Sequence, residues 1–202
     1  MTDDSSSSLS IFRDKPWNDN DNDIWLASTV KLFRNAEQFC FPTKLGLDQR
    51  KQMVSLVKRG LEGAPQLSNL VIANAEDLSP LEKEYLFEHY LSQQSFHQAR
   101  SGEAFAIDDS GAFFAMINVR DHLTLQVTDC EGDLESTWNR LMTLEAKAGK
   151  VIPYAFNHRF GFLVADPTLC GTAMMVHAFL QVPALIHSGE IKKALHQSLQ
   201  EG

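Results

Sequence analysis

Residues 116–127 are the stretch that most constrains the fold of this chain. An apolar run gives way to the tetrapeptide Val119-Arg120-Asp121-His122, after which an alternation places Leu123, Leu125 and Val127 on one face. Period-two alternation predicts a strand with one buried side. The tetrapeptide therefore lies where two strands meet, a place where a rigid scaffold can present side chains to a ligand.

Length and charge restrict the class of protein. The 202 residues are enough for one domain with a sizeable core. The net charge of −8 disfavours nucleic acid or an anionic membrane as a partner, because both need a basic surface. No apolar stretch approaches the roughly 20 residues that span a bilayer. Cys40, Cys130 and Cys170 form no CxxC pair, so we expect no metal site and no disulfide framework, and we predict a cytoplasmic protein.

Residues 1–23 differ in composition from the rest. They are rich in Ser, Asp and Asn, which predicts a disordered acidic tail before a domain over residues 24–202. Ile11, Phe12 and Trp17 could dock onto a surface, so a solubilising leader and a partner-binding arm both stay open. We expect the tail to be dispensable for folding.

The remaining patterns predict helices interleaved with short strands. This mixture indicates an α+β fold, an antiparallel β-sheet flanked by helices. Ser79-Pro80-Leu81-Glu82 is a capping box that opens a helix, and Asp133 caps a helix that is expected to bury Leu134. Helices are predicted over 47–62, 79–92, 133–149 and from Ser188 onward, and strands over 24–35, 70–73, 104–107, 112–117, 123–128, 160–164 and 174–182.

Several motifs, taken in order, resemble one enzyme family. Residues 28–35 read Ser-Thr-Val-Lys-Leu-Phe-Arg-Asn, residues 88–92 read Glu-His-Tyr-Leu-Ser, and residues 118–125 read Asn-Val-Arg-Asp-His-Leu-Thr-Leu. Gly161-Phe162-Leu163 and the Pro-Thr and Gly-Thr pairs at 167–172 follow. The corresponding segments of the ATP:guanido phosphotransferases, the arginine, creatine and bacterial protein-arginine kinases, include Ser-Arg-Ile-Arg-Leu-Ala-Arg-Asn and Asn-Glu-Glu-Asp-His-Leu-Arg-Ile. The resemblance covers Trp25 to about Glu190 and implies a shortened, glutamine synthetase-like catalytic domain, most similar to bacterial protein-arginine kinases.

The resemblance also implies which residues would do the family's chemistry. A family member uses a carboxylate to orient and deprotonate a guanidinium, and arginines to hold the phosphates of Mg-ATP. The base position is occupied here by Val119, its acidic neighbour by Arg120, and the substrate-side cysteine by Asp166. Only Lys31 keeps a cation at the arginine positions that can be checked. The vestigial nucleotide-binding positions are Ser28, Thr29, Lys31, His89, Thr124 and Met175.

These replacements favour a catalytically inactive relative with a binding or regulatory role and no expected cofactor. Two alternatives stay open: an active enzyme whose rebuilt site uses Asp166 as base beside His122 or His177, and a purely structural adaptor. His177 alternates within an apolar strand, which also fits a core histidine. A chain that ends after residue 202 would leave the apolar strand 174–182 uncovered. We therefore expect a homo-oligomer or a protein partner, with a full-length kinase relative as one candidate.

Overall fold

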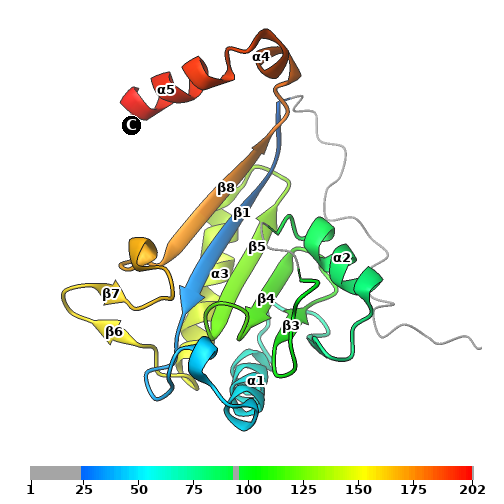
Figure 1. Ribbon diagram of the computed structural model, residues 1–202, viewed down its shortest axis with the longest axis vertical. Helices are drawn as coiled ribbons and strands as arrows, with labels where there is room; N and C mark the ends of the chain where they lie inside the picture. The colour runs from blue at the N-terminus through cyan, green and yellow to red at the C-terminus, as the bar shows by residue number, and fades with distance from the viewer. Residues whose placement is uncertain (1–23, 93–95, 202) are drawn as a thin grey trace, which may run out of the picture.

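A six-stranded antiparallel sheet organises the computed structural model, which describes residues 24–92 and 96–201 (Figure 1). The predicted tail at 1–23 lies outside the described residues. The strand order is β2-β3-β4-β5-β1-β8, and consecutive neighbours pair antiparallel. These strands are β1 (Trp25–Arg34), β2 (Val71–Asn74), β3 (Ala104–Ile107), β4 (Phe113–Ile117), β5 (Leu123–Asp129) and β8 (Met174–Leu180). The predicted α+β class and the antiparallel sheet are confirmed.

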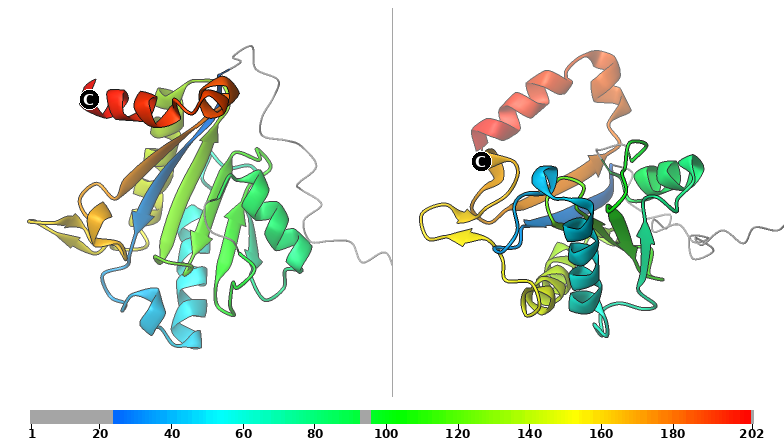
Figure 2. Two further views of the ribbon diagram at one scale, coloured as in Figure 1. Left: turned by 45° about the horizontal axis from the view of Figure 1, so that its top comes forward. Right: turned by 60° about the horizontal axis from the view of Figure 1, so that its bottom comes forward.

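Two long helices cover one face of this sheet. They are α1 (Leu47–Leu61) and α3 (Leu134–Gly149), and they pack side by side (Figure 2). Leu123, Leu125 and Val127 on β5 point into the core that these helices close. The alternation therefore correctly predicted the apolar face of β5, but the expectation of a single buried side is wrong, because all seven residues of the strand are buried.

The opposite face is covered only in part. Helix α2 (Pro80–His89) starts with the predicted capping box, since Ser79 N donates to Glu82 Oε2 over 2.8 Å. After this helix, Tyr90 stacks on Phe114 with ring centroids 4.3 Å apart, and Phe105 extends the aromatic cluster. The cluster packs on β3 and β4. Beyond it, on β5, β1 and β8, the same face carries polar side chains.

The strand predicted over 160–164 is confirmed only at residues 161 and 162, and it lies outside the main sheet. The structure instead forms the two-residue strands β6 (Phe156–Asn157) and β7 (Gly161–Phe162), which pair in a separate small sheet. Gly161 has φ of +72°, and a Cβ there would lie 2.5 Å from the backbone of Gly171. This close approach bends the segment out of the main sheet.

The helix boundaries near the end of the described chain also differ from the prediction. Ser188 ends α4 (Pro183–Ser188) and does not cap the last helix, because Gly189 adopts φ of 75° and stops α4. Helix α5 (Ile191–Glu201) then begins, and both helices extend away from the sheet beyond the end of β8 (Figure 1). The expected burial of Leu134 is also wrong, since this side chain is 45% exposed at the start of α3. The short 3-10 turns are η1 (Pro42–Lys44) and η2 (Pro167–Leu169).

Candidate functional site

A cavity of about 210 Å³ lies on the polar part of the sheet. It collects side chains from β1, β4, β5, β8 and the turn between β4 and β5. Its lining residues are Lys31, Phe33, Ser92, Met116, Val119, Arg120, Thr124, Met175 and His177. Five of the positions that the sequence singled out for the base and the nucleotide therefore come together: Lys31, Val119, Arg120, Thr124 and Met175.

Strand register explains this convergence. On β1, Lys31 lies beside Met175 of β8, and Phe33 lies beside Thr124 of β5. Residues two apart on a strand share a face, so these side chains point to the same side of the sheet. Thr29 adjoins the group, with its Oγ1 atom 3.5 Å from Nδ1 of His177.

Two of the predicted nucleotide-binding residues lie elsewhere. Ser28 Oγ accepts a hydrogen bond from Trp25 Nε1 over 2.9 Å, and the side chain follows the alternation of β1 to the opposite face. His89 is buried, with Nε2 3.3 Å from Gly111 O and its ring stacked on Tyr85. Burial lowers the pKa of His89, and the contact with Gly111 opposes this shift. Neither residue lines the cavity.

Lys31 is the unusual group of the cavity. Its side chain is 5% exposed, and it makes no hydrogen bond or ion pair with the described residues. Removal from water lowers the pKa of its amine to about 8. Partial burial also lowers the pKa of His177, and the charge of Lys31 adds to that effect.

Arg120 and Asp166 form an ion pair beside the cavity. Arg120 Nη2 donates to Asp166 Oδ2 over 2.8 Å. Asp166 Oδ1 accepts from Thr168 Oγ1 at 2.7 Å and from Thr168 N at 3.0 Å. These Thr168 bonds, and then the Arg120 contact, lower the pKa of Asp166. The described residues that bond to this carboxylate are Arg120 and Thr168, so the structure does not pair Asp166 with His122 or His177.

Below the turn, a buried network holds its backbone. Asp121 Oδ1 accepts from Asn35 Nδ2 at 2.5 Å and from Ala165 N at 2.7 Å, while Asn35 Oδ1 accepts from His122 N at 2.9 Å. Burial raises the pKa of Asp121, and its hydrogen bonds oppose that shift. His122 Nδ1 accepts from Ala36 N at 3.1 Å, and burial lowers the pKa of His122 to about 4. His122 is therefore a neutral structural group.

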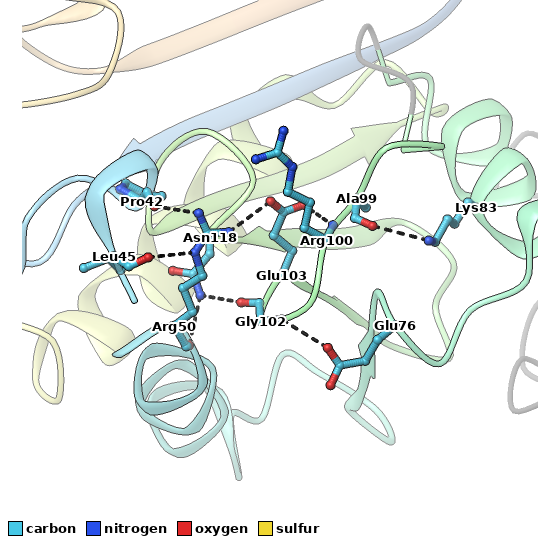
Figure 3. Close-up of polar contacts among 10 residues, drawn as sticks. All are labelled: Pro42, Leu45, Arg50, Glu76, Lys83, Ala99, Arg100, Gly102, Glu103 and Asn118. Carbon is cyan, nitrogen blue, oxygen red and sulfur yellow. Dashed lines mark hydrogen bonds and ion pairs between the residues drawn. The ribbon is translucent and has the colours of Figure 1, made fainter. Parts of the chain in front are cut away.

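A second set of contacts fixes the start of the turn (Figure 3). Asn118 adopts φ of +61°, and its Nδ2 donates to Arg50 O over 3.0 Å and to Gly102 O over 2.8 Å. Arg50 in turn binds Glu103 Oε1 at 3.2 Å and Pro42 O at 2.8 Å. No sequence motif points to Arg50 or Glu103. Asn118 is the one residue of this network that matches the family motif, and its side chain carries no reactive group.

Within residues 24–92 and 96–201, no group of three or more His, Cys, Asp or Glu side chains could hold a metal ion. None of the described helices is long and apolar enough to cross a membrane.

Comparisons with known protein sequences point to one family. The profile of the ATP:guanido phosphotransferase C-terminal catalytic domain matches residues 52–201. The protein-arginine kinase of Chlamydia pneumoniae is 29% identical over 179 residues, which are 89% of this chain and 50% of that protein. The protein-arginine kinase of Clostridium novyi is 31% identical over 187 residues, or 92% of this chain and 54% of that protein. The chain thus spans about half the length of the curated relatives it matches.

Solved structures show the same fold. The duplicated taurocyamine kinase from Schistosoma mansoni with bound transition state analog components superposes with a TM-score of 0.75 at 19% identity, covering 90% of this chain and 27% of that chain. A lombricine kinase superposes with a TM-score of 0.66 at 18% identity, covering 81% of this chain and 50% of that chain.

Proposed function

Because the chain belongs to the ATP:guanido phosphotransferase family, we propose that it is a member that transfers no phosphoryl group and acts by binding, in a regulatory role in the cytoplasm. The observation that carries this proposal is the ion pair between Arg120 and Asp166. In the family motif, a carboxylate and a cysteine act on a substrate guanidinium. At the matching positions of this chain, the guanidinium belongs to Arg120, and it pairs with the carboxylate of Asp166.

The acid–base chemistry of the site agrees with this proposal. Val119 has no ionisable group, and Arg120 repels an incoming guanidinium. Asp166 is a poor substitute base, because its pKa is lowered by Thr168 and Arg120 and both of its oxygens already accept hydrogen bonds. A general base needs a pKa near the working pH and a free lone pair towards its proton donor.

The cavity does not fit Mg-ATP. Family arginines suit phosphate because each guanidinium donates paired hydrogen bonds and stays charged. Their matching positions are Thr29, Lys31, Thr124 and Met175, which leave one partly deprotonated amine. Each charge-assisted contact is worth roughly 1.5–3 kcal/mol, so losing three removes useful affinity for a triphosphate.

The residues that match the family motif are the ones that support the fold. Arg34, Asn35, Asn118, Asp121 and His122 are each at most 3% exposed, and all take part in the hydrogen bonds between strands and loops. The residues that depart from the motif line the cavity or its rim. The chain therefore keeps the scaffold of the family without its reactive groups.

An exposed apolar surface supports the binding role. Leu26 of β1 is 42% exposed, and Val176 and Leu180 of β8 are 47% and 54% exposed. Strand β8 lies at the edge of the sheet and contains no Asp, Glu, Lys or Arg. An uncharged apolar edge favours pairing with another strand. A second copy of the chain is the simplest partner, and a full-length kinase relative is the alternative.

Thermal unfolding with nucleotide tests the proposal. A ligand at a hundred times its Kd adds about 2.7 kcal/mol of stability, which raises the Tm of a chain of this size by roughly 5–10 °C. We expect no such rise with millimolar Mg-ATP. The protein-arginine kinase of Chlamydia pneumoniae serves as the comparison protein. A rise of 5 °C or more that the Lys31→Met variant lacks would refute the proposed loss of the nucleotide site.

A further inference from the structure

Lys31 is a buried residue whose amine has no hydrogen-bond or ion-pair partner among the described residues. Long charged side chains are almost never fully buried unless they are paired. Lys31 is 5% exposed, lines the cavity, and makes no hydrogen bond or ion pair with any described residue. Gln126 on β5 is the strand partner of Lys31 on β1. Its Nε2 donates to Tyr90 O, and its Oε1 has no hydrogen-bond partner among the described residues. No described side chain of the sheet therefore forms a hydrogen bond or an ion pair with the Lys31 amine.

The surroundings of the amine favour its neutral form. Phe33, Met116 and Met175 supply apolar walls, and none of the described residues that line the cavity carries a carboxylate. The titratable groups that face the cavity with Lys31 are His177 on β8 and Arg120 on the turn. Of these two groups, Arg120 is positively charged and His177 is favoured in its neutral form, so neither supplies a negative charge to the amine. Burial lowers the pKa of the amine to about 8, so about a quarter of the amines are neutral at pH 7.5, against about 0.1% for an ordinary lysine.

We propose that Lys31 is a covalent binding site for a small aldehyde or ketone. A desolvated lysine in an apolar pocket is a known kind of amine nucleophile. Its nitrogen attacks the carbonyl carbon and forms a C–N bond. The carbonyl oxygen then leaves as water with two hydrogens that the amine supplies, and an imine remains. The step needs no oxidant, reductant or nucleotide.

The shape of the cavity limits the ligand. A volume of about 210 Å³ is below the 300–1,000 Å³ of sites for drug-sized molecules, so it admits a short-chain carbonyl compound. Burial and the charge of Lys31 lower the pKa of His177, so its neutral ring can accept a proton from the attacking nitrogen and return it to the departing oxygen. This inference goes beyond the proposed binding role and does not depend on the loss of ATP chemistry.

Reductive trapping tests the inference on the unaltered chain. The protein is treated with propionaldehyde and cyanoborohydride at pH 7.5, digested, and the alkylation of each lysine is followed by mass spectrometry. Lys51 on α1 is exposed and provides the internal reference. A less basic amine is also a weaker nucleophile, so we expect Lys31 to react at least about tenfold faster, less than its excess of neutral amine alone would give.

The pH profile and one variant complete the test. Labelling of Lys31 should reach half its maximum near pH 8. The Lys31→Arg variant keeps a positive charge at this position, but a guanidinium does not form an imine. We expect this variant to lack the rapid labelling at position 31 and to label its other lysines as the unaltered chain does. Equal rates for Lys31 and Lys51 at pH 7.5, or labelling of Lys31 that keeps rising to pH 10, would overturn the proposal. Because the rates are read in the unaltered chain, a folding defect in the variant does not affect this decision.

Discussion

Arg120 Nη2 lies 2.8 Å from Asp166 Oδ2, so a guanidinium and a carboxylate from two distant loops meet at the rim of the cavity. The first belongs to the turn between β4 and β5, and the second precedes η2. In the family's motif these positions act on a substrate guanidinium. In this chain, Arg120 itself supplies the guanidinium that pairs with Asp166. For this reason we propose that the protein acts by binding and does not transfer a phosphoryl group.

The buried pair of Arg34 and Glu145 should dominate the stability of the scaffold. Arg34 is 3% exposed, and its Nε donates to Glu145 Oε1 over 2.7 Å. Glu145→Ala leaves the guanidinium buried without its counter-charge, which typically costs 3–5 kcal/mol. Arg34 keeps its contact with the Phe162 ring, 3.7 Å from the ring centroid, so we expect about 3 kcal/mol, measured by urea unfolding.

Glu88→Ala is the matched control for that change. Glu88 is exposed on α2, and its side chain makes no hydrogen bond or ion pair with the described residues, so its replacement should change the free energy of unfolding by less than about 0.5 kcal/mol. Similar losses in the two variants would show that the Arg34–Glu145 pair contributes nothing specific.

His122 should make stability depend on pH. Its Nδ1 accepts from Ala36 N, so protonation breaks that bond, and its pKa in the fold is about 4. The unfolded chain protonates near the ordinary value of about 6.5. A lowered pKa contributes stability that is present above about pH 6.5 and is lost as the pH falls through about 4. The free energy of unfolding should therefore decline over this window.

Replacing the imidazole isolates this contribution. His122→Gln removes the titrating group and should flatten the decline between pH 6.5 and 4, even though it lowers stability at neutral pH. His158→Gln, at an exposed site, should leave the slope unchanged. An unaltered slope in the His122 variant would show that other groups cause the pH dependence.

Patterns within one element predicted most of the fold. The alternation over Leu123, Leu125 and Val127 depends only on local geometry, so it placed β5 and its apolar face correctly, although it did not predict that the polar face is buried too. The capping box at Ser79 likewise predicted the start of α2. Such signals involve residues a few positions apart, which a single sequence contains in full.

The errors and omissions come from distant contacts. Residues 160–164 have the composition of a strand, but the approach of Gly161 to Gly171 directs them into a separate hairpin. Asn35 and Asp121 are 86 positions apart, and Arg34 and Glu145 are 111 apart. Composition and periodicity carry no information about such pairs. The resemblance to the family predicted that the cavity residues belong to one site, but it did not predict the ion pair between Arg120 and Asp166.

The exposed edge strand should support association. Val176 is 47% exposed on β8, and a charge at an edge strand opposes pairing with another strand. We expect light scattering at micromolar concentration to give a mass above one chain, and Val176→Lys to reduce it. Gln181→Lys adds the same charge just beyond the strand and should have little effect. A monomeric mass for the unaltered chain would rule out self-association and leave only the partner hypothesis.

Transfer of labelled phosphate from Mg-ATP to protein arginine is the most direct test of the central claim. The protein-arginine kinase of Chlamydia pneumoniae provides the positive control under the same conditions. We predict that this chain gives no transfer above the background without protein, because Val119 and Arg120 supply no base and Arg120 engages Asp166. Phosphorylation that exceeds background and disappears in the Asp166→Asn variant would contradict the account and identify Asp166 as the base of an active, rebuilt site.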